Sequence, residues 1–393
     1  MEFHAIHETP FVFPNDLHPA WSIMIVLYPY VTGMVAGSFV VSALYHVFRR
    51  EELRPVARLA VVTSLCFCAC ATLPLLLHLH QPFRALNVVA TPSPSSAMAG
   101  FGFIYSFYML LLLVDVWLLF RPAIVERART VPGRLGQVYK ALALGVLEIT
   151  PGSAAIDHRL VGILSLVGIP AACLLHGYVG FLFGAIKANP WWSTSLMPVI
   201  FLTSAIVSGI SVLVLLYLFL CRRSGLEPDD ACMRALAQLL WRFLILAVTF
   251  EAIDILHVAY EREEEWYVIR ELLSTKLRFT YLTIQVLIGS IVPLLLLPIP
   301  AFTTWFDAPF RRSCTGVAAV LVLAQVLAMR WNVVVGGQLF SKSFRGFVEY
   351  PVTWWGREGL VAAAIVLAMP LVLLWGFSRL LPVWPPETEG EMQ

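Results

Sequence analysis

Residues 196–221 read LMPVIFLTSAIVSGISVLVLLYLFLC, a run that contains no charged side chain. A helix needs about 20 mainly apolar residues to cross a hydrocarbon core roughly 30 Å thick, so this run is long enough to span a membrane. Only helices and closed barrels satisfy their backbone hydrogen bonds in lipid, and the run is too long for a barrel strand of about 9–11 residues. The stretch therefore predicts a transmembrane helix.

The same pattern recurs along the whole chain. Of its 393 residues, 59% are hydrophobic and 13% are charged, whereas about 25% of a soluble protein is charged. We expect an all-α polytopic membrane protein with about nine transmembrane helices, arranged as two four-helix bundles plus one extra C-terminal helix. The predicted spans are residues 20–48, 55–79, 98–121, 159–184, 196–221, 235–260, 278–300, 313–331 and 357–381.

These spans divide the chain into a series of segments. An outer N-terminal segment precedes the first bundle, and an outer loop separates the second bundle from the ninth helix. The segments are 1–19 (outer N-terminal segment), 20–184 (first bundle), 185–334 (second bundle), 335–356 (outer loop), 357–381 (ninth helix) and 382–393 (inner tail).

Basic residues gather in every second loop, which is the pattern of loops on the cytoplasmic side of a membrane. We therefore expect a multi-pass protein of the inner (cytoplasmic) membrane with a periplasmic N-terminus and a cytoplasmic C-terminus. One inner loop, 122–158, is long, and residues 136–149 within it are either an interfacial helix or part of an ordered loop. The basic residues that give this orientation are Arg49, Arg50, Arg54, Arg58, Arg121, Arg127, Arg129, Arg134, Lys140, Arg222, Arg223, Arg234, Arg311 and Arg312.

The composition argues against several functions. The seven cysteines form no CxxC motif, and Cys66, Cys68 and Cys70 alternate along one predicted helix, so they point around it rather than at one metal. We expect no metal site and no iron–sulfur cluster in this chain. No glycine-rich nucleotide loop is evident, and a formal net charge of +2 gives no sign of a nucleic-acid partner.

The predicted outer ends of the first four helices combine imidazoles with aromatic rings. A quinone ring is flat and apolar, and its carbonyls become hydroxyls on reduction, so it suits aromatic walls and partners that both donate and accept hydrogen bonds. The alternative is an ordinary aromatic belt with interfacial histidines. A b-type heme would need two facing histidines, and only His18 with His176 offers a pair. The histidines and aromatic residues at these ends are His18, His78, His80, His176, Trp21, Tyr28, Tyr30 and Tyr178.

A second polar group lies in the sixth predicted span, at FEAIDILHVAY (250–260). Glu251, Asp254 and His257 are spaced three apart and form one slanted stripe on a helix. A charged residue at membrane depth costs at least about 2.5–3.5 kcal/mol, so the stripe must face protein, water or other charges. We expect a proton path that includes these three residues with Asp115 and Arg242. The alternative is structural: Glu251 or Asp254 pairs with Arg242 or Arg330 and holds the bundles together.

Four stretches resemble the NrfD/polysulfide reductase membrane subunit family over nearly the whole chain. They are HGYVGFLFGAIKANPWWSTSLMPVIFLTSAIVSGISVLVL (176–215), WSIMIVLYPYVTGMVAGSFVVSAL (21–44), QPFRALNVVATPSPSSAMAGFGF (81–103) and RWNVVVGGQLFSKSFRGFVEY (330–350). The last resembles the branch that includes DsrP of the DsrMKJOP complex and its relatives in the Hmc complex.

The resemblance implies a quinone or quinol site at the outer face of the first bundle and a periplasmic ferredoxin-like iron–sulfur partner beside it. Carried onto this sequence, the predicted quinone-binding residues are Asn15, His18, Trp21, Tyr28, His176 and Tyr178, where His176 replaces the tyrosine common in the family. The exchangeable substrate would be a quinone such as menaquinone, and cytochromes are candidates for further redox subunits.

The resemblance also favours a docking role for RWNVVVGGQ (330–338), where adjacent glycines allow close backbone approach. The alternative is a helix end with a snorkelling arginine and a turn. The predicted docking residues are Arg330, Asn332, Gly336, Gly337 and Gln338.

Together these observations predict the quinone-interacting membrane subunit of a redox complex, of the kind that serves sulfur or sulfite respiration. It is an oxidoreductase component rather than a complete enzyme. The alternative function is a secondary transporter that uses the Glu251 stripe to couple an ion. Transporters of that class carry broken helices at the membrane midplane, whereas Pro and Gly here cluster near helix ends, apart from Gly289 and Pro293.

Overall fold

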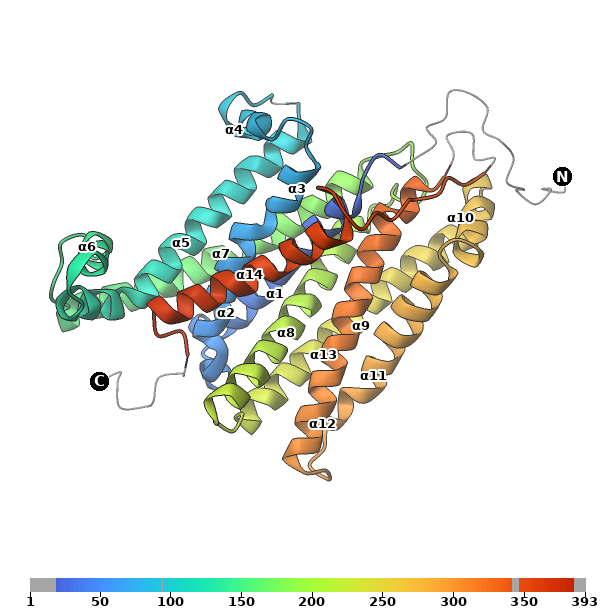
Figure 1. Cartoon of the computed structure of the whole chain (residues 1–393). Coiled ribbons are helices and arrows are strands. Elements are labelled where there is room, and N and C mark those ends of the chain that lie inside the picture. Colours follow the sequence, from blue (N-terminus) through green and yellow to red (C-terminus); the bar gives the residue numbers. More distant parts are fainter. Residues whose placement is uncertain (1–18, 94, 341–345, 385–393) are drawn as a thin grey trace.

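The architecture is that of a bundle of long helices (Figure 1). The computed structural model describes residues 19–93, 95–340 and 346–384, and within these ranges it contains helices and turns but no β-strand. One isolated antiparallel bridge joins Phe340 to Phe347. The predicted quinone residues Asn15 and His18 lie outside the described residues.

Eight helical segments are long and apolar enough to cross a membrane, which confirms the predicted all-α polytopic membrane fold. A ninth long helix, α9 (Asp230–Glu261), has 32 residues but a more polar composition, and its role as a further crossing remains a prediction. The eight are α1 (Ile23–His46); η1 (Glu51–Leu53), α2 (Arg54–Ala71) and α3 (Leu73–His78) as one crossing; α5 (Ala97–Thr130); α7 (Pro151–Gly184); α8 (Met197–Ser224); η3 (Arg278–Ile291), α11 (Val292–Leu296) and α12 (Pro298–Phe302) as one crossing; α13 (Ala308–Val334) with η4 (Gly336–Gln338); and α14 (Leu360–Leu380).

The helices begin and end where local chemistry favours it. Ser22, Ser96 and Thr150 cap the N-termini of α1, α5 and α7 by accepting a backbone N–H with the side-chain oxygen. Asp229 caps α9 in the same way, with Cys232 N 2.7 Å from its Oδ1. At the other end of the same connection, Gly225 terminates α8 with a φ of +66°, a conformation that glycine adopts readily.

Several connections differ from the predicted ones. α5 continues nine residues beyond its predicted end at 121, and α7 begins eight residues before its predicted start at 159. The long inner loop 122–158 is therefore mostly helix, because charged residues beyond the apolar run extend the same helices. Between them lies the short α6 (Gly133–Leu142), which overlaps only the first half of the stretch 136–149. The acidic outer connection also contains a helix, α10 (Glu264–Ser274), and the loop before α5 contains η2 (Pro82–Leu86) and α4 (Asn87–Ala90).

Close packing of α1 against α8 joins the first half of the chain to the second. A Cβ atom on Gly37 would overlap the backbone of Ile206 and Gly209, and one on Gly209 would overlap Gly37 and Ser38. Glycines at both positions let the two backbones touch, as in other tightly packed membrane helices. The buried core is continuous across both halves, so the predicted division into two bundles at residue 184 stays an organisational proposal.

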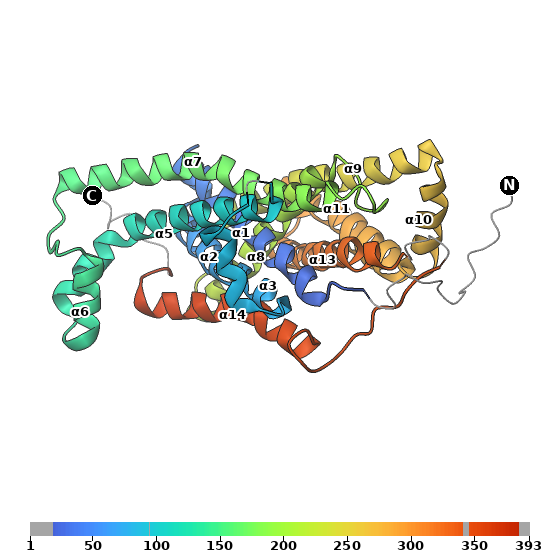
Figure 2. The same ribbon diagram turned by 90° about the horizontal axis from the view of Figure 1, so that it is seen from above.

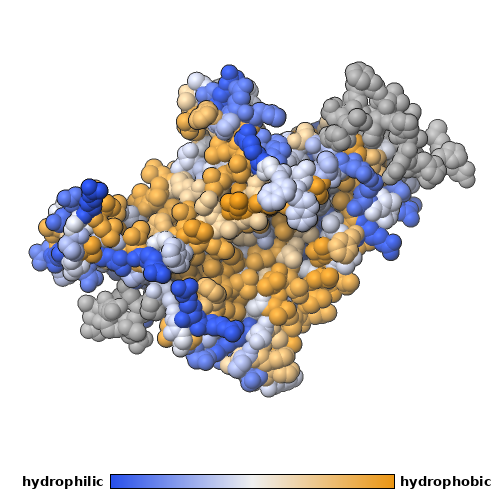
Figure 3. All heavy atoms as spheres, in the orientation of Figure 1, coloured by the Kyte–Doolittle hydropathy of each residue, from blue (hydrophilic) through white to orange (hydrophobic). Residues whose placement is uncertain are grey.

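The two ends of the bundle differ in character. The end that holds the last residue of α1 and the first residues of α2, α9 and α13 is called the basic end below; the opposite end, which holds residues 185–197, is called the pocket end. At the basic end Arg311 and Arg312 both bond Asp230, at 2.9 and 3.1 Å, and tie α13 to α9. Apolar residues cover much of the face seen between these ends, and hydrophilic residues gather near the ends and around α6 (Figure 3).

The last helix returns along the flank of the bundle. α14 lies on one side of the molecule, beside α2 and α1, while α6 projects at one edge and α10 at the other (Figure 2). Tyr350, in the segment before α14, accepts a hydrogen bond from Ile23 N at 2.9 Å. Burial raises the pKa of Tyr350, so its hydroxyl stays neutral. This contact fixes the N-terminus of α1 at the pocket end.

Candidate functional site

A pocket lies at the pocket end, between the connection 185–196 and the helices α8, α9, η3 and α13. It offers about 60 Å³ to small molecules, more than the roughly 10–15 Å³ that one ordered water needs. Two carboxylates, Glu251 and Asp254, face it together. The other lining residues are mainly apolar or aromatic: Pro190, Trp191, Ser193, Thr194, Met197, Ile200, Ile255, Val258, Ile269, Tyr281, Gln285, Met329 and Val333.

Glu251 is held by amide side chains from two neighbouring segments. Its Oε2 accepts a hydrogen bond of 2.8 Å from Gln285 Nε2 on η3, and its Oε1 accepts one of 3.0 Å from Gln325 Nε2 on α13. Gln285 Oε1 accepts from Asn332 Nδ2 at 2.7 Å, and Asn332 Oδ1 accepts from Thr280 Oγ1 at 2.7 Å. Among the described residues, no arginine, lysine or histidine forms an ion pair with Glu251. The carboxyl group therefore sits in a network of neutral hydrogen-bond donors.

A departure from regular helix geometry accompanies this network. Residues 278–291 form a π-helix, and π-helical turns are rare and frequent at functional sites. Gln285 lies in this segment and is buried. Gly289, one turn further on, packs against Gln325 so closely that a Cβ would overlap its Cα and Cβ atoms. The π-helix and the glycine together bring Gln285 and Gln325 to the same carboxylate.

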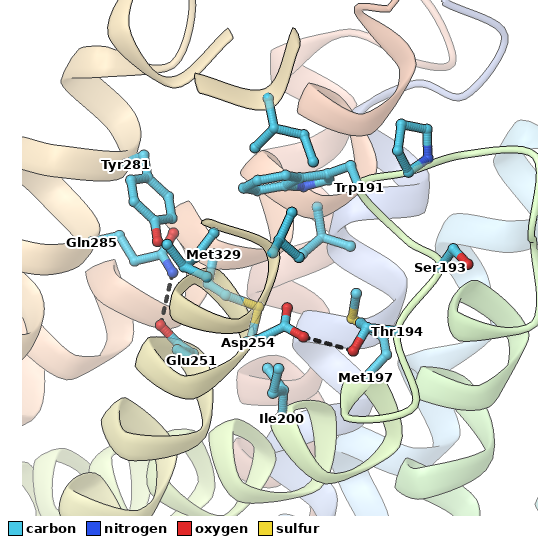
Figure 4. A pocket seen from close by; sticks show the side chains of 15 residues that line it. Trp191, Ser193, Thr194, Met197, Ile200, Glu251, Asp254, Tyr281, Gln285 and Met329 are labelled. Atoms are coloured by element: carbon cyan, nitrogen blue, oxygen red, sulfur yellow. Dashed lines mark hydrogen bonds between the residues drawn. The ribbon is translucent and has the colours of Figure 1, made fainter. Parts of the chain in front are cut away.

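Asp254 is held from the other side of the pocket. Its Oδ1 accepts a hydrogen bond of 2.6 Å from Thr194 Oγ1, and Leu196 N donates to that hydroxyl at 3.1 Å. Figure 4 shows Glu251 and Asp254 on the same helix with their carboxylates directed to different partners. Because three helical residues rise about 4.5 Å, the two acids lie close enough to share the same small space.

Aromatic side chains close the upper part of the pocket. The indole of Trp191 lies across it near Met329, and Tyr281 stands beside Gln285 (Figure 4). Trp191 Nε1 donates to Asn332 O at 3.0 Å, and its ring meets Tyr281 edge-on with centroids 6.2 Å apart. The tryptophan is thus fixed by the same segment that supplies Asn332 to the Glu251 network.

The structure brings together only two of the five predicted proton-path residues. His257 is exposed, pairs with Glu261 at 3.4 Å and does not line the pocket, because one further turn carries the slanted stripe onto the surface. Arg242 is also exposed, and no ion pair joins it to Glu251 or Asp254 among the described residues, which contradicts the pairing alternative for Arg242. Asp115 is buried on α5, in the first half of the chain, and its Oδ1 has no hydrogen-bond partner among the described residues.

The predicted docking residues lie mostly inside the protein. Arg330, Asn332, Gly336 and Gly337 are buried, and Gln338 is partly buried, so the side chains of the first two are inaccessible to a partner. Gln338 Oε1 accepts from Trp21 N at 2.8 Å instead. The end of α13 and the following turn pack into the bundle rather than project from it, and a docking role for this stretch stays a prediction.

Arg330 is a fully buried cation near the C-terminal end of α13. Its Nη2 donates to Ser204 Oγ at 2.8 Å and to Phe201 O at 3.2 Å, and its guanidinium carbon lies 3.8 Å from the centroid of the Phe201 ring. A cation over an aromatic face is stabilised by the ring, most strongly away from water. Neither Glu251 nor Asp254 forms an ion pair with it among the described residues, so Arg330 does not provide the pairing expected of a structural salt bridge.

The described members of the predicted quinone set lie near the pocket end but face different neighbours. Trp21 stacks on Trp192, with centroids 5.0 Å apart. His176 is buried, with Nδ1 3.1 Å from Ala172 O and Nε2 in contact with Thr32 O. Tyr178 OH donates to Ala97 O at 2.8 Å. Tyr28 meets Phe101 edge-on at 5.5 Å, and its hydroxyl has no hydrogen-bond partner among the described residues.

Sequence reasoning missed the amides that surround Glu251. Gln285 and Gln325 each stand alone in an apolar run, at YLTIQVLIGS and LVLAQVLAMR. A lone amide in a membrane helix is itself a polar signal that requires a partner. Within the described ranges, no group of three or more histidine, cysteine, aspartate or glutamate residues is arranged to hold a metal ion.

The fold and this site define a polytopic helical membrane protein with a buried carboxylate–amide pocket. The family model described as "Polysulphide reductase, NrfD" matches residues 14–342. The chain belongs to this family, which confirms the resemblance seen in the sequence and identifies it as a membrane redox subunit.

Three relatives illustrate the family. The chain is similar to a selenate reductase subunit of Mesobacillus selenatarsenatis, with 27% identity over 89% of this chain and 84% of the relative. It is also similar to a putative dimethyl sulfoxide reductase membrane subunit of Halobacterium salinarum, with 26% identity over 79% of this chain and 66% of the relative. An Hdr-like menaquinol oxidoreductase integral membrane subunit of Archaeoglobus fulgidus shares 23% identity over 82% of this chain and 72% of the relative.

Proposed function

We propose that this chain is the quinone-interacting membrane subunit of a multi-subunit oxidoreductase. It exchanges electrons between a membrane quinone and an iron–sulfur subunit that docks at the pocket end. Family membership supports the redox role, and the similarity to a menaquinol oxidoreductase subunit supports menaquinone as the quinone. The resemblance of residues 330–350 supports the DsrP branch, and with it a role in sulfur or sulfite respiration.

The observation that carries the proposal is the pair of acids in one small pocket. Glu251 and Asp254 share a space with room for water, and hydrogen bonds from neutral groups fix both carboxyl groups. Quinone reduction consumes two protons and quinol oxidation releases two, so a quinone subunit needs groups that pass protons to or from water. Intramembrane carboxylates that face an internal cavity commonly serve this purpose. We assign Glu251 and Asp254 to this proton transfer.

The quinone itself is assigned to the N-terminal end of α1. The aromatic rings of Trp21, Phe183 and Trp192 lie together there: Trp21 and Trp192 stack, and Phe183 meets both edge-on, at 5.6 and 5.5 Å. This group provides the flat apolar wall that a quinone ring needs. The predicted residues Asn15, His18, His176, Tyr28 and Tyr178 stay candidates for contact with the quinone.

Orientation follows from the charge distribution. We assign the basic end to the cytoplasmic side under the positive-inside rule, and we assign the pocket end and the N-terminus to the periplasmic side of the inner membrane. A periplasmic ferredoxin-like subunit would then dock over residues 185–197 and the N-terminal end of α1. The chain would hold no heme or iron–sulfur cluster of its own.

A photoreactive quinone tests this assignment. An azidoquinone is illuminated with the purified complex, and the labelled peptides are identified by mass spectrometry. We expect labelling in residues 19–30 or 176–192, abolished by excess unlabelled menaquinone, and co-purification of an iron–sulfur protein. Labelling confined to the basic end, or none that menaquinone displaces, would contradict the proposal.

The alternative function is ion-coupled transport through the same acidic pocket. The interrupted helix formed by η3, α11 and α12 favours this alternative, because transporters bind ions beside broken helices. The purified chain alone, reconstituted in vesicles, separates the two functions. Solute uptake without a redox partner would support transport, and quinone-linked electron transfer that requires an iron–sulfur partner would support the proposed function.

A further inference from the structure

A second pocket lies at the basic end, between the last turn of α1 and the first half of α7. Its volume is about 400 Å³, and it is separate from the Glu251 pocket. Four of its eight lining residues can carry positive charge, and none is acidic. The lining residues are His46, Val47, Arg49, His158, Arg159, Gly162, Ile163 and Leu166.

The cationic groups of this pocket are free to bind a ligand. The side chains of Arg49 and Arg159 are exposed, and no ion pair or hydrogen bond engages either within the described part of the chain. Two of the nearby acids have other partners, since Asp157 pairs with Arg121 at 2.8 Å and Glu52 pairs with Arg50 at 2.6 Å.

A buried nitrogen points to the same ligand chemistry. Nε2 of His46 is shielded from solvent and has no hydrogen-bond partner among the described residues. A buried polar atom without a partner is uncommon and calls for an unseen group or water. Arg49 also adopts a φ of +54°, a conformation in which glycine is the usual residue at a helix end. The backbone conformation therefore does not explain why this position is an arginine.

The apolar side of this pocket favours a ligand with hydrocarbon chains over a soluble anion. Ile163 and Leu166 continue along α7 from the cationic residues into the membrane-spanning region, and they are 49% and 55% exposed. A Cβ built on Gly162 would meet no atom within 4 Å, so the surface there is open. The cationic side chains thus lie next to an exposed apolar surface. This arrangement fits a molecule with an anionic head and hydrocarbon chains.

We propose that this pocket binds an anionic phospholipid. The phosphate lies between Arg49 and Arg159 with His46 beneath it, and the acyl chains run along Ile163 and Leu166. Basic pockets between helices at a membrane surface bind such headgroups, and each arginine contributes a favourable interaction with anionic lipid. The site would anchor the first half of the chain at the lipid surface opposite the quinone.

Photo-crosslinking tests the proposal. The full-length protein, with any co-purifying subunits, is placed in nanodiscs of phosphatidylcholine containing a phosphatidylglycerol probe with a diazirine on its acyl chain. We expect crosslinks in residues 160–167 with this probe, and few with a phosphatidylcholine probe of the same design. The double variant Arg49→Gln with Arg159→Gln should lose these crosslinks by roughly tenfold or more.

Arg222 and Arg223 provide a matched control, because both are exposed at the basic end but neither lines the pocket. The double variant Arg222→Gln with Arg223→Gln should keep the crosslinks. If the Arg49/Arg159 variant does not fold, the exposed Arg159→Gln change alone should still reduce them about fivefold.

Three results would overturn the proposal. Equal crosslinking by the two probes would show a nonselective apolar surface. Equal loss in both double variants would show a general effect of charge. Loss of crosslinking on addition of inorganic phosphate would show a site for a soluble anion rather than a lipid.

Discussion

The carboxylate of Glu251 accepts a hydrogen bond of 2.8 Å from the side-chain amide of Gln285, across the interface between α9 and the π-helical segment η3. A glutamate that is hydrogen-bonded by amides differs from one that is paired with arginine. An arginine strongly favours the ionised carboxylate, whereas a neutral amide favours it much less. The proposed proton transfer requires such a carboxyl group, one that can gain and lose a proton during turnover.

Asp254→Asn should slow quinone-linked electron transfer, on the order of tenfold or more, because an amide cannot release a proton to the pocket. His257→Gln should leave the rate unchanged, because His257 lies outside the pocket. Rates are measured per assembled complex in membranes. Equal slowing by both variants would show that His257 belongs to the proton path, as the sequence predicted, and that the path is not confined to Glu251 and Asp254.

His176→Phe should abolish quinone-linked activity while the complex still assembles. The imidazole contacts the carbonyls of Thr32 and Ala172, and phenylalanine fills a similar volume without donating a hydrogen bond. The measurement is quinone content and quinone-linked rate in the purified complex. Normal values of both in the variant would remove His176 from the quinone site.

Arg330→Lys should destabilise the protein by about 2 kcal/mol or more. Lysine lacks the planar group that lies over Phe201 while donating to Ser204. Arg379→Lys is the control, because Arg379 is exposed and its guanidinium carbon lies 5.1 Å from the Trp375 ring; its cost should stay below about 1 kcal/mol. Thermal unfolding in detergent measures both. Equal stability of the two variants would contradict the structural role of Arg330.

Gly209→Val should prevent stable packing of α1 against α8, at a cost of at least about 1–3 kcal/mol for overpacking, because the added side chain overlaps the backbone at Gly37 and Ser38. Gly177→Val, on α7, provides the matched comparison because a Cβ at that position would meet no atom within 4 Å. The yield of monodisperse protein reports the difference. Similar yields for both variants would show that α1 and α8 can separate without loss of the fold.

The sequence predicted the membrane fold because a long apolar run has few alternatives in lipid. The predicted span 196–221 corresponds closely to α8 (Met197–Ser224). The predicted helix ends were wrong where charged residues continue a helix beyond the apolar run, as in α5 past residue 121 and α7 before 159. A hydropathy pattern shows only the part of a helix that is apolar enough to lie in the membrane, and not where the helix itself ends.

Prediction of the site was limited by contacts between distant segments. Glu251 and Asp254 could be singled out because acids in an apolar run are costly. Their partners could not be assigned, because Gln285 and Gln325 lie 34 and 74 residues further along the chain. The burial of Arg330 could not be predicted from the sequence either, because a cation near a helix end more often reaches water than packs on an aromatic ring such as Phe201.

Glu251→Gln separates proton transfer at Glu251 from a purely structural role, with the yield of assembled complex and the quinone-linked rate measured in the same preparation across a range of pH. Glutamine keeps the size of the side chain and one oxygen, which at the Oε2 position lies 2.8 Å from Gln285 Nε2 and 3.3 Å from Gln325 Nε2, but it cannot exchange a proton. We expect normal yield, a rate lower by on the order of tenfold or more, and a flatter dependence of that rate on pH. A low yield with an unchanged rate per assembled complex would contradict proton transfer by Glu251 and show that this residue serves only to hold the helices together.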